Sequence, residues 1–474
     1  METRIEEDSI GRREVPREAY YGIQSLRASE NFQITDLNIH PRLVSSLAQV
    51  KKAAAESNRE IGLLNVEKAD AIVQACEEVK KGSLHDQFIV DAVQGGAGTS
   101  INMNMNEVLA NRALEILGEE KGSYQVIHPN NHVNMGQSTN DVIPTAIRIT
   151  TYNMLGEVKK QIERLISALE DKAEEFDDVI KMGRTQLQDA IPIRLGQEFQ
   201  AYASVIKRDR IRFEKTGDDL KTVNLGATAV GTGLNADQEY VAMVTEVLSR
   251  LTGIDLEQAD DLVDATQNVD ALVEVSSVLK TCAANLSKIA NDLRIMSSGP
   301  RTGINEIDLP AVQPGSSIMP GKVNPVIPEV INQISYHIMG CDATITKAAE
   351  AGQLELNVMQ PVIMYNLFQG IEMMRNGIDT FIDNCIVEIE ANKERCRSLV
   401  DGSVGIITAI NPHVGYETAA YVAKKALSED KSVREIIIEE GILSEKELDE
   451  ILDPYEMTEP GIAGRDLLDY QERK

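Results

Sequence analysis

The stretch that decides the fold is residues 272–296, LVEVSSVLKTCAANLSKIANDLRIM. Apolar side chains recur there at alternating intervals of three and four residues, and neither Gly nor Pro lies between Gly253 and Gly299. Uninterrupted heptads of this kind predict one long helix with a coiled-coil-like seam. The seam consists of Leu272, Val275, Leu279, Cys282, Leu286, Ile289, Leu293 and Met296.

Four further segments carry helical signals. The runs Leu155–Leu169, Leu195–Ile206 and Met364–Cys385 repeat the same spacing. Another helix is expected to start at Asn324–Pro325, with Asn as N-cap and Pro as the first helical residue. Five long helices predict an all-α, mainly helical fold with a central long five-helix bundle. The absence of Trp fits this prediction, because the core must then be built from aliphatic side chains.

Apolar residues also flank the central seam. Val273, Val278 and Ile295 lie beside it, so this helix is expected to be buried on more than one side. Such a pattern favours a bundle that packs against copies of itself. A monomeric bundle with a large core is the alternative.

The remaining sequence suggests three domains. Regions rich in Gly, Pro and Asn interrupt the helices at residues 93–106, 128–144 and 299–325. Beyond residue 397 the elements become shorter, and Ser444 and Glu447 have the spacing of a capping box. We therefore predict a mostly helical N-terminal domain (1–141), a central helical-bundle domain (142–396) and a small C-terminal helical domain (397–474).

The charge balance excludes several classes of partner. The 474 residues include 47 Lys and Arg against 75 Asp and Glu, a formal net charge of −28. This balance argues against nucleic-acid binding and disfavours adhesion to an anionic membrane. We expect neither a signal peptide nor a transmembrane helix. The five cysteines are widely spaced without a Cys-x-x-Cys motif, which predicts reduced thiols in a cytoplasmic protein and no zinc site.

Residues 315–325, GSSIMPGKVNP, have some features of a phosphate-binding loop. However, five residues separate Gly315 from Gly321 where that loop has four, and Val323 replaces its magnesium-binding hydroxyl. What remains is a set of polar side chains ahead of a helix: Ser316, Ser317, Lys322 and Asn324. A helix N-terminus with a nearby Lys binds carboxylates well, so we interpret this loop as an anion site. The alternative is a polar connection.

Three other segments are rich in Gly and polar side chains. Gly95–Ser100 lacks the spacing of a dinucleotide-binding loop, although its backbone N–H groups suit an oxyanion. Gly136–Asp141 places hydrogen-bonding side chains just before a helix, where capping is the simpler interpretation. Gly183–Asp189 is a polar cluster between helices. No His stands beside a Ser with a matching acid, so a Ser-His-Asp hydrolase is not expected.

Taken together, these segments resemble the aspartase/fumarase superfamily. The motifs that carry the resemblance are Gly96–Ser100, Gln137–Asp141, Gly183–Asp189, Gly226–Asn235 and Gly315–Pro325. The resemblance implies three mostly helical domains and a homotetramer with a core of twenty helices, in which three subunits share each active site.

Within that family, four segments and one residue are similar to the aspartase branch: Arg4–Asp8, Arg13–Pro16, Tyr20–Gly22, Lys431–Glu435 and Gln186. The position of Gln186 is usually His in class II fumarases and also in some aspartases. The resemblance therefore implies reversible elimination of ammonia from L-aspartate to give fumarate. The alternatives are a class II fumarate hydratase and a non-catalytic helical oligomer.

The resemblance also implies residue roles. Ser316 would be the catalytic base, acting as an alkoxide that the loop and a helix end must stabilise. The β-carboxylate, where negative charge develops, would be held by Ser317, Thr99, Ser138 and Thr139. The α-carboxylate would be held by Lys322, Asn324 and Thr185. The amino group would be contacted by Thr139, Asn140 and Gln186.

These motifs require no metal, and no cofactor is expected. Magnesium activation occurs in some relatives and is not readable from these residues. No general acid is assigned, because a leaving ammonium needs none. His128 matches a residue near a secondary dicarboxylate site in fumarases, and we assign it no role.

Overall fold

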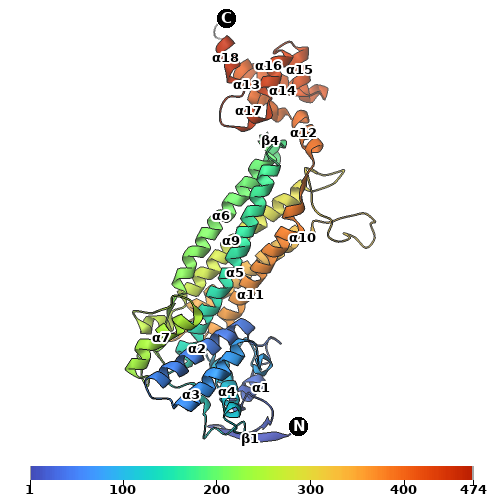
Figure 1. Cartoon of the computed structure of the whole chain (residues 1–474). Helices are drawn as coiled ribbons and strands as arrows, with labels where there is room; N and C mark the ends of the chain where they lie inside the picture. Colours follow the sequence, from blue (N-terminus) through green and yellow to red (C-terminus); the bar gives the residue numbers. More distant parts are fainter. Residues whose placement is uncertain (1, 472–474) are drawn as a thin grey trace. The chain divides into compact units, whose positions relative to one another are not determined.

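The computed structural model describes residues 2–471, which form mostly helices (Figure 1). The α-helices are α1 (Ile23–Asn31), α2 (Pro41–Glu60), α3 (Val66–Lys80), α4 (Thr99–Ile116), α5 (Thr139–Glu175), α6 (Leu195–Asp219), α7 (Gln238–Thr252), α8 (Leu262–Gln267), α9 (Asp270–Met296), α10 (Val326–Glu350), α11 (Gln360–Asn384), α12 (Lys393–Gly402), α13 (Ile407–Val414), α14 (Tyr416–Glu429), α15 (Val433–Glu439), α16 (Glu445–Ile451), α17 (Pro454–Thr458) and α18 (Arg465–Gln471). The prediction of an all-α fold is confirmed.

The strands form small two-stranded sheets. Antiparallel pairs join β1 (Thr3–Asp8) to β2 (Gly11–Pro16), β3 (Ile180–Thr185) to β4 (Gln188–Arg194), and β7 (Ile307–Asp308) to β8 (Glu390–Ala391). A parallel pair joins β5 (Thr222–Val223) to β6 (Glu257–Gln258). The cluster at residues 183–189, expected to be a connection, is therefore the end of the β3–β4 hairpin.

The chain divides into two compact units. Unit 1 comprises Met1–Lys160, Ile211–Ala283 and Tyr336–Arg375, whereas unit 2 comprises Gln161–Arg210, Ala284–Ser335 and Asn376–Lys474. Each of the helices α5, α6, α9, α10 and α11 contributes residues to both units. The predicted domain boundaries at residues 141 and 397 stay predictions.

The long helices pack on one another inside each unit. In unit 2, Tyr202 of α6 donates a hydrogen bond to Asp292 of α9 at 3.0 Å. In unit 1, Ser276 of α9 donates to Asp342 of α10 at 2.8 Å. The five predicted long helices are thus present, and polar contacts as well as apolar ones join them.

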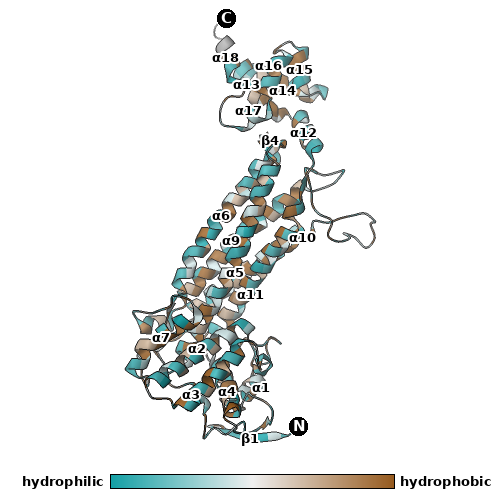
Figure 2. Ribbon diagram, viewed as in Figure 1, coloured by the Kyte–Doolittle hydropathy of each residue, from teal (hydrophilic) through white to brown (hydrophobic). Residues whose placement is uncertain are grey.

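The seam predicted for residues 272–296 is buried. Its eight members, from Leu272 to Met296, are each at most 5% exposed. The flanking Val273 and Val278 are half-buried, and Ile295 is 38% exposed. Figure 2 shows this mixture of hydrophobic and polar residues along α9 and its neighbours. A single chain therefore leaves part of the apolar flank uncovered.

Helix α2 carries an unusual residue for a buried helix. It packs against α3 and α7 within unit 1, and Leu43, Leu47 and Val50 are almost fully buried. Lys51 follows directly and is also 0% exposed. A Lys at such a position requires hydrogen-bonding partners in the interior, because burying an ammonium is costly.

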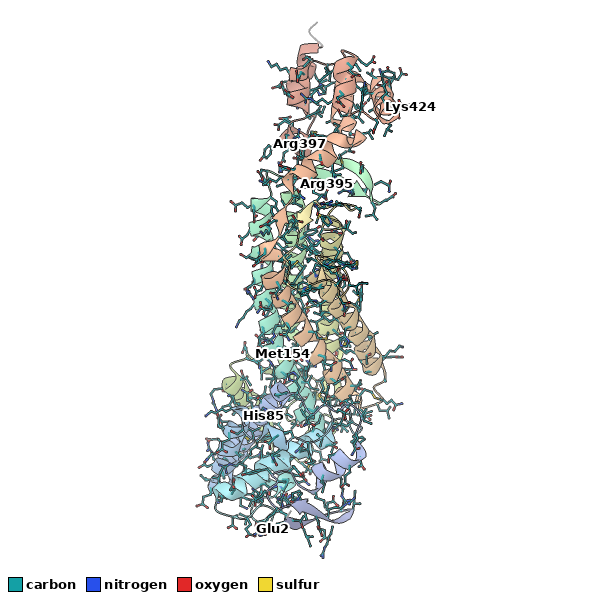
Figure 3. The ribbon with its side chains drawn as sticks, turned by 90° about the vertical axis from the view of Figure 1, so that its right-hand side faces the viewer. Glu2, His85, Met154, Arg395, Arg397 and Lys424 are labelled. Atoms are coloured by element: carbon teal, nitrogen blue, oxygen red, sulfur yellow. The ribbon has the colours of Figure 1, made fainter. Side chains whose placement is uncertain are left out.

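The C-terminal helices share one small core. Val422, Ile436 and Leu448 lie in it together with Ile180 and Met182 of strand β3. The predicted capping box from Ser444 to Glu447 is confirmed at the start of α16. Figure 3 shows Arg395 and Arg397 on α12, which precedes these helices in the chain.

One helix start differs from the prediction. Helix α10 begins at Val326, so Pro325 is not its first residue. Asn324 does not act as the N-cap, because its side-chain amide donates to the carbonyl of Gly315 at 2.6 Å. The Asn is used to close the preceding loop instead. Across residues 2–471, none of the helices has the length and apolar character needed to cross a membrane.

Candidate functional site

The loop before α10 closes on itself. Residues 309–325 have no helix or strand, and the backbone N–H of Gly315 donates to the carbonyl of Lys322 at 2.8 Å. The amide of Asn324 closes the same neck from the side. A Cβ at position 315 would lie 2.6 Å from the Lys322 oxygen, so only glycine fits here. The neck holds residues 316–321 as a compact loop.

Within this loop, Ser316 is hydrogen-bonded by the backbone. Its Oγ accepts from the N–H of Ile318 at 3.2 Å and from the N–H of Met319 at 3.0 Å. Such turns are common around Ser, but the two donors also favour negative charge on the oxygen. Ser317 and Lys322 are exposed on the same loop, where a ligand could reach them.

Thr185 and Gln186 lie at the tip of the β3–β4 hairpin. Thr185 pairs with Gln188, which leaves Gln186 and Leu187 as a two-residue turn. Both turn residues have positive φ, 55° and 60°. This turn suits the twist of a hairpin but is normally made by Asn and Gly. Gln186 is exposed at this tip of the hairpin.

A buried ion cluster fixes strand β3. Glu306 is 0% exposed and pairs with Arg184 at 2.8 Å and with Lys181 at 3.2 Å. Lys181 also pairs with Glu198 at 2.9 Å, and burial raises the pKa of Glu198. Removing one partner from such a cluster leaves an uncompensated charge in the interior. The cluster ties the hairpin that carries Thr185 to the segment that leads into the 309–325 loop.

The other predicted site residues lie in unit 1, at the starts of α4 and α5. Thr99 is the first residue of α4 and is exposed, while its hydroxyl donates to the Gly96 carbonyl at 2.8 Å. Thr139 is the first residue of α5 and accepts from the Asn102 amide at 3.3 Å. A Cβ on Gly98 would lie 3.2 Å from Ile143, so the two helix starts are close together.

Ser138 and Asn140 complete this group. The Ser138 hydroxyl accepts from the backbone N–H of Asn140 at 3.2 Å, so it caps α5 as the simpler interpretation expected. The Asn140 amide donates to the carbonyl of Ala229 at 2.7 Å, and its own carbonyl accepts from Asn224 at 3.0 Å. The Gly226–Asn235 motif therefore supports the start of α5.

Asp141, the last residue of the Gln137–Asp141 motif, supports this group without being one of the predicted site residues. It is fully buried and accepts from the backbone N–H groups of Ser138 at 2.9 Å, Gly226 at 3.2 Å and Thr228 at 3.1 Å. Burial raises its pKa to about 6, although these three bonds oppose the rise. Asp141 thus joins the α5 start to the 226–228 loop.

The ten predicted site residues therefore form two groups. Unit 1 brings together Thr99, Ser138, Thr139 and Asn140, whereas unit 2 holds Thr185, Gln186, Ser316, Ser317, Lys322 and Asn324. His128 lies outside both groups, where its Nδ1 accepts from the backbone N–H groups of Asn130 and Asn131. Burial lowers the pKa of His128.

Comparisons with known proteins identify the family of this chain. Residues 11–340 match the family model described as Lyase, and residues 406–459 match the model described as Fumarase C C-terminus. Proteins named aspartate ammonia-lyase from Bacillus sp and Escherichia coli are 59% and 48% identical to this chain. The alignments cover 98% and 99% of this chain, and 99% of each relative.

Solved structures give the same result. The fumarate lyase:delta crystallin of Brucella melitensis, solved bound to cobalt, has a TM-score of 0.94 at 50% identity. The class II fumarase of Schistosoma mansoni has a TM-score of 0.91 at 37% identity. Each comparison covers 97% of this chain and 100% of the other. The chain therefore belongs to the lyase family of the aspartase/fumarase superfamily.

Proposed function

We propose that this chain is an aspartate ammonia-lyase, which converts L-aspartate reversibly into fumarate and ammonium. Curated relatives of that name, 48–59% identical over nearly the whole chain, support the assignment. The structural observation that carries it is the pair of backbone N–H donors on Ser316 Oγ.

Ser316 acts as the base. Its alkoxide removes a proton from the β-carbon of aspartate, and the electron pair of that C–H bond moves onto the β-carboxylate. Ser is a weak base in water, so its anionic form must be stabilised before it can react. The N–H groups of Ile318 and Met319 supply that stabilisation at 3.2 and 3.0 Å.

The intermediate carries extra charge on the β-carboxylate, so donors must concentrate there. Ser317, Thr99, Ser138 and Thr139 take this role. Lys322, Asn324 and Thr185 hold the α-carboxylate, and Thr139, Asn140 and Gln186 contact the amino group. Neutral donors outnumber charged ones in this set, so they stabilise the intermediate without trapping the fumarate product.

The second step breaks the bond between the α-carbon and nitrogen. The electron pair returns from the carboxylate to form the carbon–carbon double bond, and nitrogen leaves with the bonding electrons of the C–N bond. Because the amine is protonated in the substrate, it departs as neutral ammonia and takes up a proton in water. The Ser316 proton passes to solvent to restore the alkoxide. No resident cofactor takes part in this scheme.

We further propose a homotetramer in which three subunits build each site. The uncovered apolar flank of α9 supports association, because Ile295 is 38% exposed beside a buried seam. The resemblance to the aspartase/fumarase superfamily, in which three subunits share each active site, supports shared sites here. The five cysteines, all buried free thiols, suit the reducing cytoplasm in which we place the enzyme.

One assay tests the assignment. Purified protein is incubated with L-aspartate or with L-malate, and fumarate is followed by its ultraviolet absorbance. We expect fumarate and ammonium from aspartate in equal amounts. Faster production of fumarate from L-malate than from L-aspartate would instead identify a fumarate hydratase. No turnover of either substrate would indicate a non-catalytic oligomer.

A further inference from the structure

A buried lysine side chain lies beneath the turn that leads into the unit 1 site group. Lys51 Nζ donates to the side-chain oxygen of Asn134 at 2.8 Å and to that of Gln137 at 2.9 Å. Gln137 directly precedes Ser138 in the chain. Lys51 is therefore linked through two amides to a turn that ends at three of the predicted site residues.

Asn134 is the centre of this network. Its side-chain oxygen also accepts from the amides of Asn102 and Asn106, both at 3.1 Å, while its own amide donates to the Gln137 carbonyl at 3.1 Å. The Asn102 amide makes a second contact, with the Thr139 hydroxyl at 3.3 Å. The position of Thr139 therefore depends on the same residue that Lys51 holds.

The opposite side of the turn is fixed by Asp141, which accepts from the Ser138 N–H at 2.9 Å. Asp141 and Lys51 are both fully buried, and each charge favours the charged form of the other. A buried Lys without a directly bonded carboxylate is expensive, so packing alone does not explain it. Methionine would fill the same space without that cost.

We propose that Lys51 is a positioning residue for the reaction, which orders residues 134–137 and thereby places Ser138, Thr139 and Asn140 against the dicarboxylate substrate. It does not contact the substrate. The identity of the substrate in this inference rests on the proposed function. The binding of any dicarboxylate at the site depends on Lys51 in the same way.

The test compares Lys51→Met with Lys52→Met. The first variant removes the terminal nitrogen and its hydrogen-bond donors and keeps the aliphatic stem. The second is a matched control, because Lys52 is on the same helix but pairs with Glu77 at 2.6 Å, away from the turn. We expect Lys51→Met to lower kcat/KM for L-aspartate at least tenfold, to raise KM, and to weaken succinate binding measured by calorimetry. The control should stay within about twofold of the wild type.

Thermal unfolding and sedimentation separate positioning from a loss of structure. A merely structural role would lower the active fraction while KM and succinate affinity stay at wild-type values, and that result would overturn the proposal. So would wild-type kinetics in folded Lys51→Met. Because succinate binding does not require turnover of aspartate, a wild type that fails to deaminate aspartate refutes the proposed function, while the succinate affinities of wild type and Lys51→Met still decide the role of Lys51.

A second variant keeps the proposal testable if Lys51→Met does not fold. Gln137→Leu removes one acceptor from the turn and leaves Lys51 bonded to Asn134. We expect a loss of kcat/KM of about threefold or more, again with weaker succinate binding. In the double variant the two losses should be less than multiplicative, because both act through one network. Wild-type values in folded Gln137→Leu, or fully multiplicative losses, would contradict the proposal.

Discussion

Ser316 Oγ lies 3.0 Å from the backbone nitrogen of Met319, which donates a hydrogen bond to it from three residues further along the same closed loop. A loop that solvates its own hydroxyl oxygen prepares that oxygen to carry charge before substrate arrives. The hydrogen bond between Gly315 and Lys322 closes the loop that holds this geometry.

The first prediction follows from this geometry. Ser316→Ala should lower kcat by about 10²–10⁴-fold, the usual contribution of a general base. The fold should survive, because within residues 2–471 the Ser316 side chain is hydrogen-bonded by the backbone of its own loop. Steady-state kinetics and circular dichroism check this together. A variant that keeps much of the wild-type rate with an unchanged pH profile would exclude Ser316 as the base.

The neck of the loop gives a second prediction. Gly315→Ala places a Cβ within 2.6 Å of the Lys322 carbonyl and 2.7 Å of the Asn324 nitrogen, so the backbone must move apart. We expect at least a tenfold loss of kcat with little change in melting temperature. Gly402→Ala is the control, since its Cβ would meet no atom within 4 Å. Full activity in Gly315→Ala would show that the closed neck is dispensable.

Subunit sharing can be tested by complementation. Ser316→Ala and Thr185→Val should each be inactive alone, and mixed tetramers should regain activity because some sites then combine an intact Ser316 with an intact Thr185 from another chain. The mixture is dissociated, reassembled and assayed, with exchange verified by mass spectrometry. Absence of rescue after verified exchange counts against shared sites.

Gln186 is expected to help select aspartate over malate. An amide carbonyl accepts from ammonium and does not titrate, whereas His titrates near neutral pH. Gln186→His should lower kcat/KM for aspartate without abolishing it. The activation free energy should rise by about 1–3 kcal/mol, the cost of losing one polar contact. The backbone should tolerate the change, because His is enriched among the non-glycine residues found at positive φ. The measurement is kcat/KM of the wild type and of Gln186→His, each with L-aspartate and with L-malate. A wild type that prefers L-malate would refute the assignment as an aspartate ammonia-lyase.

The pH dependence of stability should report on Lys51. Burial lowers its pKa to about 7, against the opposing charge of Asp141 and the neighbouring Cys76 thiol. Between about pH 7 and its ordinary value of 10.5, the unfolded chain binds the proton and the folded chain does not, so wild-type stability rises with pH. Lys51→Met lacks this rise.

The free energy of unfolding of that variant, minus that of the wild type, should therefore fall between about pH 7 and 9. The loss of one titrating group can change this difference by at most about 1.4 kcal/mol for each pH unit. Urea unfolding at fixed protein concentration measures it, with Lys52→Met as the comparison. A difference that stays constant with pH would show that Lys51 keeps an ordinary pKa.

The sequence predicted the long helices well because their signal is local. The seam from Leu272 to Met296 needs only a helical period to be recognised, and it is buried in the structure. Asn324 was assigned to a helix cap because Asn-Pro usually starts a helix, yet its amide closes a loop nine residues wide. Rules based on neighbouring residues do not predict the role of a side chain whose hydrogen-bond partner is distant in the sequence.

The same limit applies to the candidate site. Ser316 and Lys322 belong to one motif and were identified together. Lys51 and Asp141 were not, because a Lys beside another Lys normally indicates a solvated helix face, and an Asp near a helix start normally indicates a cap. Their importance depends on burial and on partners about 83–86 and 85–87 residues away in sequence. The β3–β4 hairpin was missed since its strands are too short to show clear alternation.

The left-handed turn at Gln186 and Leu187 bears on how this enzyme could be redesigned. Each non-glycine residue held in that conformation costs roughly 1–2 kcal/mol. A library that varies both positions freely would include many β-branched and bulky side chains that are strongly disfavoured at positive φ, and loss of the hairpin would be mistaken for loss of specificity. Fixing position 187 as Gly or Asn first would relieve the backbone strain there, so that the hairpin would tolerate more substitutions at position 186. New amine substrates could then be screened against the chemistry of one side chain alone.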